Sequence, residues 1–304
     1  MKSIRSVLAL SIAGALVLGA CGGDDDDSSG EATASPTINV GRTDDPSSQL
    51  AAEIFGQGLE NAGYRIGRKD SSADDDAALD AVKAGGTQLF SVYSADLLAY
   101  LKANGGAGSD AVSITDQMTA IREQLPDTMT AFEPADVDNR TVIACGAAVV
   151  DEHSLTNVSD FVAAEGVTFG GTQDFQDATA GGLAALNTTY GAELTMTAVD
   201  DVAASLVDGS VDCAALPALS PAIVLDGLIV LDDDQQFAPA NKLVPVMTSE
   251  AGQADVQAVV DAINAKLSTD VVRSLLVKVQ DPDSGLSYDT IARQFLGTTS
   301  SDQG

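Results

Sequence analysis

The chain has 304 residues, with 45 acidic side chains against 15 lysines and arginines and a formal net charge of −30 at pH 7. This excess of negative charge argues against nucleic acid and anionic lipid headgroups as partners. The length allows one large domain or two of ordinary size after the first 36 residues.

The chain begins with the pattern of a lipoprotein export signal. Lys2 and Arg5 precede an apolar run at residues 7–20, and small residues come directly before Cys21. The run is too short to span a bilayer stably, so we expect residues 1–20 to be a signal peptide that is removed. Cys21 would then carry the lipid that anchors the protein to the membrane. The alternative is an ordinary secretory signal followed by an incidental cysteine.

The stretch after the signal, residues 21–36, consists largely of Gly, Asp, Ser, Ala and Thr. Such a composition cannot bury enough apolar surface to fold, so we expect a disordered acidic tether. Removal of Lys2 and Arg5 with the signal changes the formal charge from −30 to −32. Asp-rich patches at residues 24–27, 74–76 and 232–234 are expected to be solvated surface, the alternative being that one of them binds a cation.

From residue 38 onward, short apolar strands alternate with helical stretches, which is the pattern of an α/β fold with a mainly parallel sheet. The first βαβαβ half is expected as a strand at 38–41, a helix at 47–62, a strand at 64–68, a helix at 75–84 and a strand at 88–92. A helical and loop region at 95–138 follows.

The alternation then restarts. Strands are expected at 141–145, 167–170, 194–199, 211–215, 228–231 and 243–248. Helices are expected at 159–164, 181–189, 202–207, 255–267, 269–279 and 288–296. Two α/β sets in series predict two lobes, the first comprising residues 37–138 and 223–304 and the second residues 139–222. A cleft between such lobes is a usual place for a small ligand.

No enzyme chemistry is indicated by the sequence. His153 is the only histidine and lies among polar residues near an expected helix start, where a solvent-facing side chain is the simplest interpretation. A second histidine and a Gly-x-Ser-x-Gly motif are both missing, and the Gly-Gly pairs at 170–171 and 181–182 lack phosphate-loop spacing. We therefore expect a protein that is not an enzyme, with no cofactor and no metal.

Two cysteines remain once Cys21 is assigned to the lipid. Cys145 and Cys213 each lie in a short apolar run that is expected to be a strand. An even pair in an exported domain favours a disulfide, and two buried free thiols are the alternative.

Several segments, taken in order and spacing, resemble one family. They are residues 38–41, 50–55, 59–64, 81–85, 92–94, 190–191, 206–212 and 227–233, followed by Phe237, Pro239 and Pro245. On these residues the chain resembles the substrate-binding lipoproteins of glycine betaine, choline and related osmoprotectant ABC importers.

The resemblance implies a two-lobed, hinge-closing fold of the periplasmic-binding-protein type II class, each lobe a mixed, mainly parallel sheet flanked by helices. It also implies delivery of ligand to an ABC permease, a monomer on the extracytoplasmic face of the membrane, and a tail that returns to the first lobe. The strands that carry Cys145 and Cys213 would be neighbours, which supports a bond between them.

The family's ligand residues carry over only in part. Tyr93 matches one tyrosine of the aromatic box that holds a quaternary ammonium by cation–π attraction. Pro217, Asn241 and Val142 stand near other box positions, and Ala178 stands where a carboxylate-binding arginine is expected. The resemblance gives these candidate ligand contacts: Thr43, Asp44, Tyr93, Asp96, Asn139, Thr172, Gln173 and Asn241.

Asp44 and Asp96 would place negative charge at the cleft mouth, which suits a cation or a polyhydroxylated ligand. The resemblance implies a binding protein that captures a small polar or cationic solute of the betaine and choline class by lobe closure and delivers it to a permease. The incomplete ligand set leads to the hypothesis that this solute lacks a carboxylate, or that the protein has drifted from osmoprotectants altogether. The alternative is a surface lipoprotein of the same fold that has lost transport and acts as a sensor or interaction protein.

Overall fold

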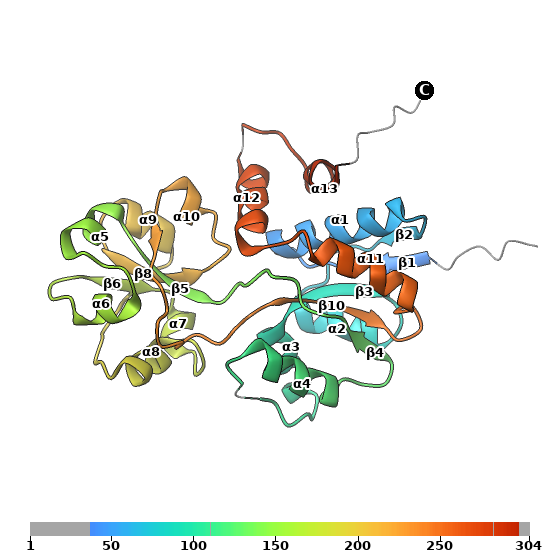
Figure 1. Ribbon diagram of the computed structural model, residues 1–304, viewed down its shortest axis with the longest axis horizontal. Helices are drawn as coiled ribbons and strands as arrows, with labels where there is room; N and C mark the ends of the chain where they lie inside the picture. The colour runs from blue at the N-terminus through green and yellow to red at the C-terminus, as the bar shows by residue number, and fades with distance from the viewer. Residues whose placement is uncertain (1–36, 110, 282, 298–304) are drawn as a thin grey trace, which may run out of the picture. The chain divides into compact units, whose positions relative to one another are not determined.

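The computed structural model describes residues 37–109, 111–281 and 283–297 (Figure 1). The expected signal peptide, the expected tether and Cys21 lie outside the described residues. The described chain forms two five-stranded sheets with helices packed against them, which confirms the α/β fold class.

The first sheet has the strand order β2-β1-β3-β10-β4. Its strands are β1 (Thr37–Val40), β2 (Arg65–Arg68), β3 (Leu89–Tyr93), β4 (Met129–Ala131) and β10 (Leu243–Thr248). β1 runs parallel to β2 and β3, whereas β10 is antiparallel to β3 and β4.

Helices cover both faces of the first sheet, because its central strands have apolar side chains on both sides. Leu89 packs in a core with α1 (Pro46–Asn61), α11 (Ala254–Asn264), α12 (Thr269–Gln280) and α13 (Tyr288–Leu296). Phe90 and Val92 pack in a second core with α2 (Asp75–Lys83), α3 (Ser94–Ala103) and α4 (Ile114–Gln124). Strands buried on both faces are expected to consist of nearly continuous apolar residues, as β3 does apart from Ser91.

The second sheet has the strand order β7-β6-β8-β5-β9. Its strands are β5 (Thr141–Cys145), β6 (Phe169–Gly171), β7 (Thr197–Ala198), β8 (Cys213–Pro217) and β9 (Ile229–Val230). Its helices are α5 (Ala147–His153), α6 (Val158–Ala163), α7 (Gln173–Asp177), α8 (Leu183–Tyr190), α9 (Val202–Val207) and α10 (Ala222–Leu225). Two apolar clusters form the core around these strands.

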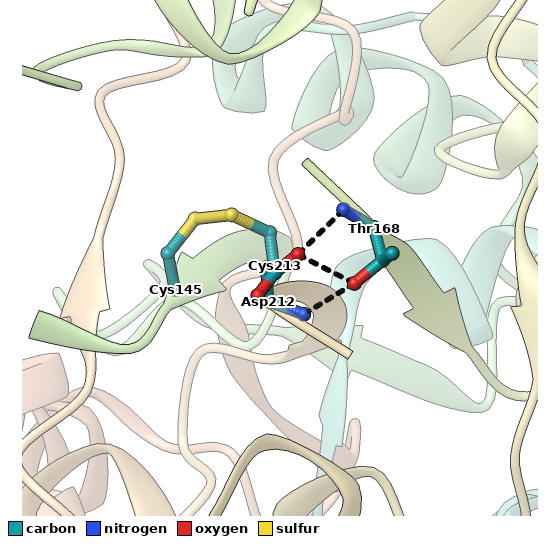
Figure 2. The surroundings of a disulfide bond; sticks show 4 residues. All are labelled: Cys145, Thr168, Asp212 and Cys213. Carbon is teal, nitrogen blue, oxygen red and sulfur yellow. Dashed lines mark hydrogen bonds between the residues drawn. A yellow bond between two sulfur atoms is a disulfide. The ribbon is translucent and has the colours of Figure 1, made fainter. Parts of the chain in front are cut away.

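Cys145 and Cys213 form the disulfide that was favoured from the sequence (Figure 2). They lie directly opposite each other on the antiparallel strands β5 and β8, with Cα atoms 4.0 Å apart. Both are fully buried in the core of the second sheet. Beside them, the Asp212 carboxylate accepts hydrogen bonds from the Thr168 backbone N–H and hydroxyl, which ties β8 to the start of β6.

One sequence expectation differs from the observed strand pairing. β9 pairs with β5, so residues 229–230 belong to the second sheet, whereas the range 223–304 was expected in the first lobe. Both sheets are mixed as expected, and each combines parallel pairings with antiparallel pairings around β5 or β10. His153 is the last residue of helix α5 and lies five residues before the start of α6, and its side chain is exposed as expected.

Within the described residues, no helix combines the length and the apolar character needed to cross a bilayer.

Candidate functional site

A cavity of about 230 Å³ lies at the carboxyl ends of β1, β2 and β3. In sheets of this kind ligands bind in the crevice outside the carboxyl ends of the strands. The helices α1, α2 and α3 each begin at this edge and each contributes an aspartate to the lining. The residues around the cavity are Asp45, Ser47, Ser48, Asp75, Ser91, Tyr93, Asp96, Asn139 and Leu243.

A larger cavity, of about 620 Å³, lies at the opposite edge of the same sheet. Thr37 at the start of β1, Gln88 before β3 and Thr248 at the end of β10 line it, together with residues that begin α11. This edge holds the amino ends of the parallel strands, away from the place where such sheets bind ligands. We therefore take the smaller cavity as the candidate site, despite its size.

Asp45 caps helix α1 and shapes one wall of the cavity. Its Oδ1 accepts hydrogen bonds from the backbone N–H groups of Ser47 and Ser48, at 2.8 and 3.1 Å. The Ser47 hydroxyl donates to the same oxygen and accepts a bond of 3.1 Å from the Tyr93 hydroxyl. Burial is the main cause that raises the pKa of Tyr93, so its hydroxyl stays protonated and donates. This chain of bonds fixes the orientation of the only aromatic ring among the described lining residues.

Asp75 and Asp96 add two carboxylates to the same cavity. Burial, followed by the charges of Asp96, Asp45, Asp74 and Asp76, raises the pKa of Asp75 to about 6. Burial also raises the pKa of Asp96, and a hydrogen bond with Asn241 opposes that rise. The Asp96 side chain is nevertheless exposed to solvent, as expected for a residue at the open mouth of a recess.

The three acidic groups are not offset by cations. Among the described residues that line the cavity, none is a lysine, an arginine or a histidine. Nor does any group of three or more His, Cys, Asp or Glu side chains in the described chain have the arrangement of a metal site. The cavity is therefore electronegative and is suited to an organic cation.

Several N–H groups of the helix starts at this edge are already bonded within the described chain. Asp45 occupies those of α1, and the Asp74 carboxylate accepts from the Ala77 N–H in α2. In α3, the Ser94 N–H donates to the Lys242 carbonyl and the Ala95 N–H to the Asn241 side chain. The chain's own acceptors thus occupy part of the positions where a ligand carboxylate would bind a helix N-terminus.

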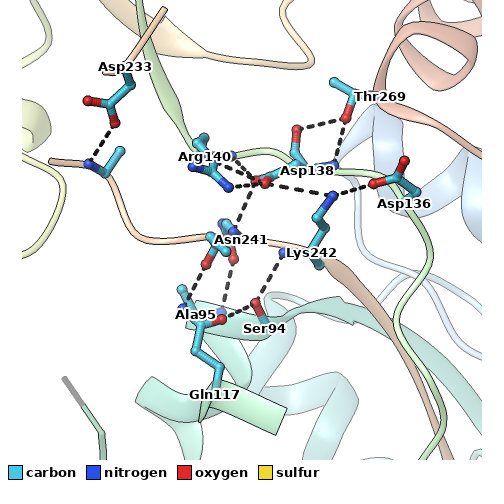
Figure 3. A network of polar contacts seen from close by, with 12 residues as sticks. Ser94, Ala95, Gln117, Asp136, Asp138, Arg140, Asp233, Asn241, Lys242 and Thr269 are labelled. Atoms are coloured by element: carbon cyan, nitrogen blue, oxygen red, sulfur yellow. Dashed lines mark hydrogen bonds and ion pairs between the residues drawn. The ribbon is translucent and has the colours of Figure 1, made fainter. Parts of the chain in front are cut away.

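Two segments, residues 138–140 and 240–242, carry the chain from one sheet to the other, and we call them the crossing segments (Figure 3). The Asn139 N–H donates to the Asn241 carbonyl over 2.9 Å. The Asn139 side chain, which lines the cavity, accepts a bond of 3.1 Å from the Leu219 N–H beyond β8. Asn139 therefore connects the candidate site with the chain of the second sheet.

Asp138 is the charged centre of the crossing segments (Figure 3). Its Oδ1 accepts from the Asn241 N–H at 3.0 Å, and its Oδ2 accepts from Arg140 Nη2 at 2.6 Å. Lys242 lies 4.0 Å from Oδ2 and pairs more closely with Asp136. Although burial opposes it, these bonds from Arg140 and Asn241 hold the pKa of Asp138 below its ordinary value. The carboxylate joins both segments at the place where a hinge is expected.

The structure brings together only part of the expected ligand set. Tyr93, Asp96 and Asn139 line the cavity, and Asn241 bonds to the helix start beneath it. Thr43 is buried beside the cavity and Asp44 is exposed, and neither lines it.

Thr172 and Gln173 begin α7, next to the second sheet, and do not line this cavity. Their role in binding stays a prediction.

Sequence reasoning missed most of the α1 and α2 contribution. Asp45, Ser47, Ser48, Asp75, Ser91 and Leu243 line the cavity and were not among the candidates. Asp75 was interpreted as part of a solvated acidic patch, and nothing in the local sequence separates it from its exposed neighbours Asp74 and Asp76. Their positions in the sequence could have identified two of these residues, because Asp45 and Asp75 both lie at the starts of helices that follow the parallel strands β1 and β2.

The sequence matches one family model over residues 36–298. Its description is the substrate binding domain of an ABC-type glycine betaine transport system, OpuAC. No curated protein matched the sequence significantly.

Solved structures with the same fold cover nearly the whole described chain. A glycine betaine/carnitine/choline ABC transporter structure has a TM-score of 0.76 at 17% identity, covering 86% of this chain and 97% of the other. Apo YehZ from Escherichia coli has a TM-score of 0.66 at 18% identity, covering 86% and 98%. Lactococcal OpuAC, closed and complexed with glycine betaine, has a TM-score of 0.53 at 10% identity, covering 86% and 95%. At these identities the likeness establishes the fold.

Proposed function

Because the chain belongs to the family of substrate-binding domains of ABC-type glycine betaine transport systems, we propose that it captures a small cationic solute without a carboxylate and delivers it to a membrane permease. The family consists of solute-binding proteins of transporters and is not an enzyme family. The cavity beside Tyr93 is the proposed binding site.

The observation that supports a cation is the composition of this cavity. Asp45, Asp75 and Asp96 face it, and no lysine or arginine is among its described lining residues, so a positive ligand gains from all three charges. The same three charges would repel a ligand carboxylate. It would also find the N–H groups of the helix starts already bonded to Asp45, Asn241 and Lys242. Glycine betaine, which carries a carboxylate, therefore fits this cavity less well than choline.

Closure of two lobes around the ligand is the proposed mechanism. The strand pairing suggests residues 37–138 and 241–297 as the first lobe and residues 139–240 as the second, joined by the crossing segments. A ligand that contacts both lobes shifts the open–closed equilibrium toward the closed form, which then docks on the permease. Asn139 supports this proposal because its side chain lines the cavity and bonds to Leu219 beyond β8.

The proposed location is the extracytoplasmic face of the cell membrane, with the protein held as a monomer by a lipid on Cys21. The Gly- and Asp-rich residues 22–36 would act as a leash. A flexible linker of this length keeps a receptor within tens of ångströms of its partner and so raises its effective concentration there.

Titration calorimetry of the mature chain with choline, glycine betaine and carnitine tests the proposal. Choline should bind, and the two carboxylate-bearing solutes should bind at least about tenfold more weakly. Tighter binding of glycine betaine than of choline would contradict the proposal.

The second candidate is a surface lipoprotein that has kept the fold but lost transport, serving as a sensor or interaction protein. The observation that favours it is the incomplete aromatic box, in which Tyr93 is the one aromatic side chain among the described lining residues. Uptake of radiolabelled choline by cells with and without the gene separates the two candidates. Equal uptake, combined with measurable binding by the purified protein, favours the sensor.

A further inference from the structure

We propose that the charged nitrogen of the bound cation carries N–H bonds, as in a primary ammonium, and is not fully methylated. This inference rests on the proposed function and narrows its ligand class. It follows from the hydrogen-bond acceptors that the cavity presents and from the aromatic surface that it lacks.

The cavity presents acceptors that the protein leaves unused. Across the described residues, the Asp75 side chain makes no hydrogen bond and no ion pair, although it is half-buried and lines the cavity. Asp45 satisfies its backbone partners through Oδ1 alone, which leaves Oδ2 without a bond to the described chain. These oxygens are bonded to water when the cavity is open. When the cavity closes, they need donors from the ligand.

An ammonium group supplies those donors. It has three N–H bonds and no acceptor, so one such nitrogen can donate to Asp45, Asp75 and Asp96 together. Bonds between ionised partners are shorter and stronger than neutral ones. The carboxylates come from the starts of three separate helices, α1, α2 and α3, which surround the cavity from different sides. This arrangement suits a nitrogen with several N–H bonds pointing in different directions.

A quaternary ammonium would use this cavity poorly. It presents only C–H groups, so it displaces the water from Asp45 and Asp75 without replacing the lost hydrogen bonds, and a buried acceptor without a partner is costly. Proteins bind such ions on the faces of several aromatic rings, and only Tyr93 is available among the described lining residues.

The volume indicates a small ligand. The cavity holds about 230 Å³, which is below the roughly 300–1,000 Å³ of pockets for drug-sized molecules. Leu243 is the single aliphatic residue of the lining, and Ser47, Ser48 and Ser91 bring hydroxyl groups. A short hydroxylated or aminated alkyl chain next to the ammonium matches these surroundings.

Ethanolamine and choline form a matched pair of probes, since they differ only in methylation of the nitrogen. Both are cationic at about pH 7.5, because choline has a permanently charged quaternary nitrogen and a primary ammonium such as that of lysine titrates well above that value. Calorimetric titration of the mature chain with each probe should show ethanolamine binding about 10- to 100-fold more tightly, the range expected for hydrogen bonds between charged groups.

Three variants test which side chains cause the difference in affinity between ethanolamine and choline. Asp75→Asn and Asp45→Ser each remove one lining charge, and serine retains the ability to cap α1. Each should weaken ethanolamine binding about tenfold or more and change choline binding less. Asp74→Ser is the matched control, because Asp74 caps α2 next to Asp75 but does not line the cavity. It should change ethanolamine binding by less than about threefold. Circular dichroism checks that all three variants are folded.

The outcomes separate this inference from the proposed function. Choline binding more tightly than ethanolamine overturns the inference while leaving a cation-binding protein. Equal weakening of both probes by Asp75→Asn also overturns it, because charge alone would then account for binding. Glycine betaine binding more tightly than both overturns the proposed function itself.

Discussion

Removing the disulfide should destabilise the second sheet by a predictable amount. In the double variant Cys145→Ala/Cys213→Ala, a covalent link between residues 68 positions apart is lost. The chain-entropy relation for a closed loop of that length gives about 4 kcal/mol, and measured losses for such bonds are typically about 2–4 kcal/mol. The strands β5 and β8 pair along five residues each, so the fold should persist without the bond.

Urea unfolding of the mature chain, followed by far-ultraviolet circular dichroism, measures this loss. With a denaturant slope of about 2 kcal/mol/M, the midpoint should fall by about 1–2 M. The reducing agent tris(2-carboxyethyl)phosphine provides the control: it should lower the midpoint of the wild type and leave that of the double variant unchanged. A wild-type midpoint that stays constant after thiol labelling has shown the bond to be broken would refute the reasoning.

Three further predictions concern single side chains. Asp138→Asn should cost about 1.5–3 kcal/mol near neutral pH. Because the folded pKa of Asp138 is lowered, this stabilisation is present above about pH 4 and lost below it, so urea midpoints of wild type and variant should converge in acid. Asn241→Ala should cost about 1–2 kcal/mol in urea unfolding by leaving the Ala95 N–H unpaired. Ethanolamine affinity should fall between about pH 7 and 5 as Asp75, with a pKa of about 6, gains a proton, whereas Asp75→Asn should abolish that dependence.

The pH dependence of Asp75 also has a consequence for stability. The pKa of Asp75 is higher in the folded chain than in the unfolded chain. Asp75 therefore contributes most to the stability of the ligand-free protein below about pH 4, and this contribution is lost as the pH rises through about 6. A bound cation should restore the stability that is lost when Asp75 ionises. Thermal unfolding with and without ethanolamine at several pH values measures both effects, and a ligand shift that does not increase with pH would speak against a contact with Asp75.

The strands and helices with strong periodicity could be predicted from the sequence. The expected helices at 202–207 and 288–296 and the strand at 243–248 match α9, α13 and β10 to the residue. Apolar spacing in these segments agrees with their burial, so the local pattern and the packing favour the same structure. The disulfide was also anticipated, because an even pair of cysteines in an exported domain favours a bond and the resemblance implied that their strands are neighbours, as they are.

Pairing between distant strands could not be predicted in the same way. β9 has two residues, Ile229 and Val230, and both are exposed, so their sequence does not indicate which sheet they join. The antiparallel direction of β10 depends on its contacts with β3, which is 150 residues earlier in the chain. These properties arise from tertiary packing, which a single sequence does not display.

The candidate site shows the same limit. Tyr93 was found because it directly follows an apolar strand, where a doubly wound sheet places its ligand loops. Asp75 was missed because it differs from Asp74 and Asp76 in being less exposed. The exposure of its side chain depends on how α2 lies against Asp45 and Asp96. Asn241 was a candidate ligand contact, and its bond to the Ala95 N–H became visible only with the fold.

A crystal structure of the mature chain grown with ethanolamine, and a second grown with choline, would show where the cation binds. We expect the cationic nitrogen beside Tyr93, within hydrogen-bonding distance of Asp75 and at least one of Asp45 and Asp96. Occupancy should be higher for ethanolamine. A solute found in the larger cavity near Thr37, or a cavity beside Tyr93 that stays empty at saturating concentrations of both solutes, would contradict it.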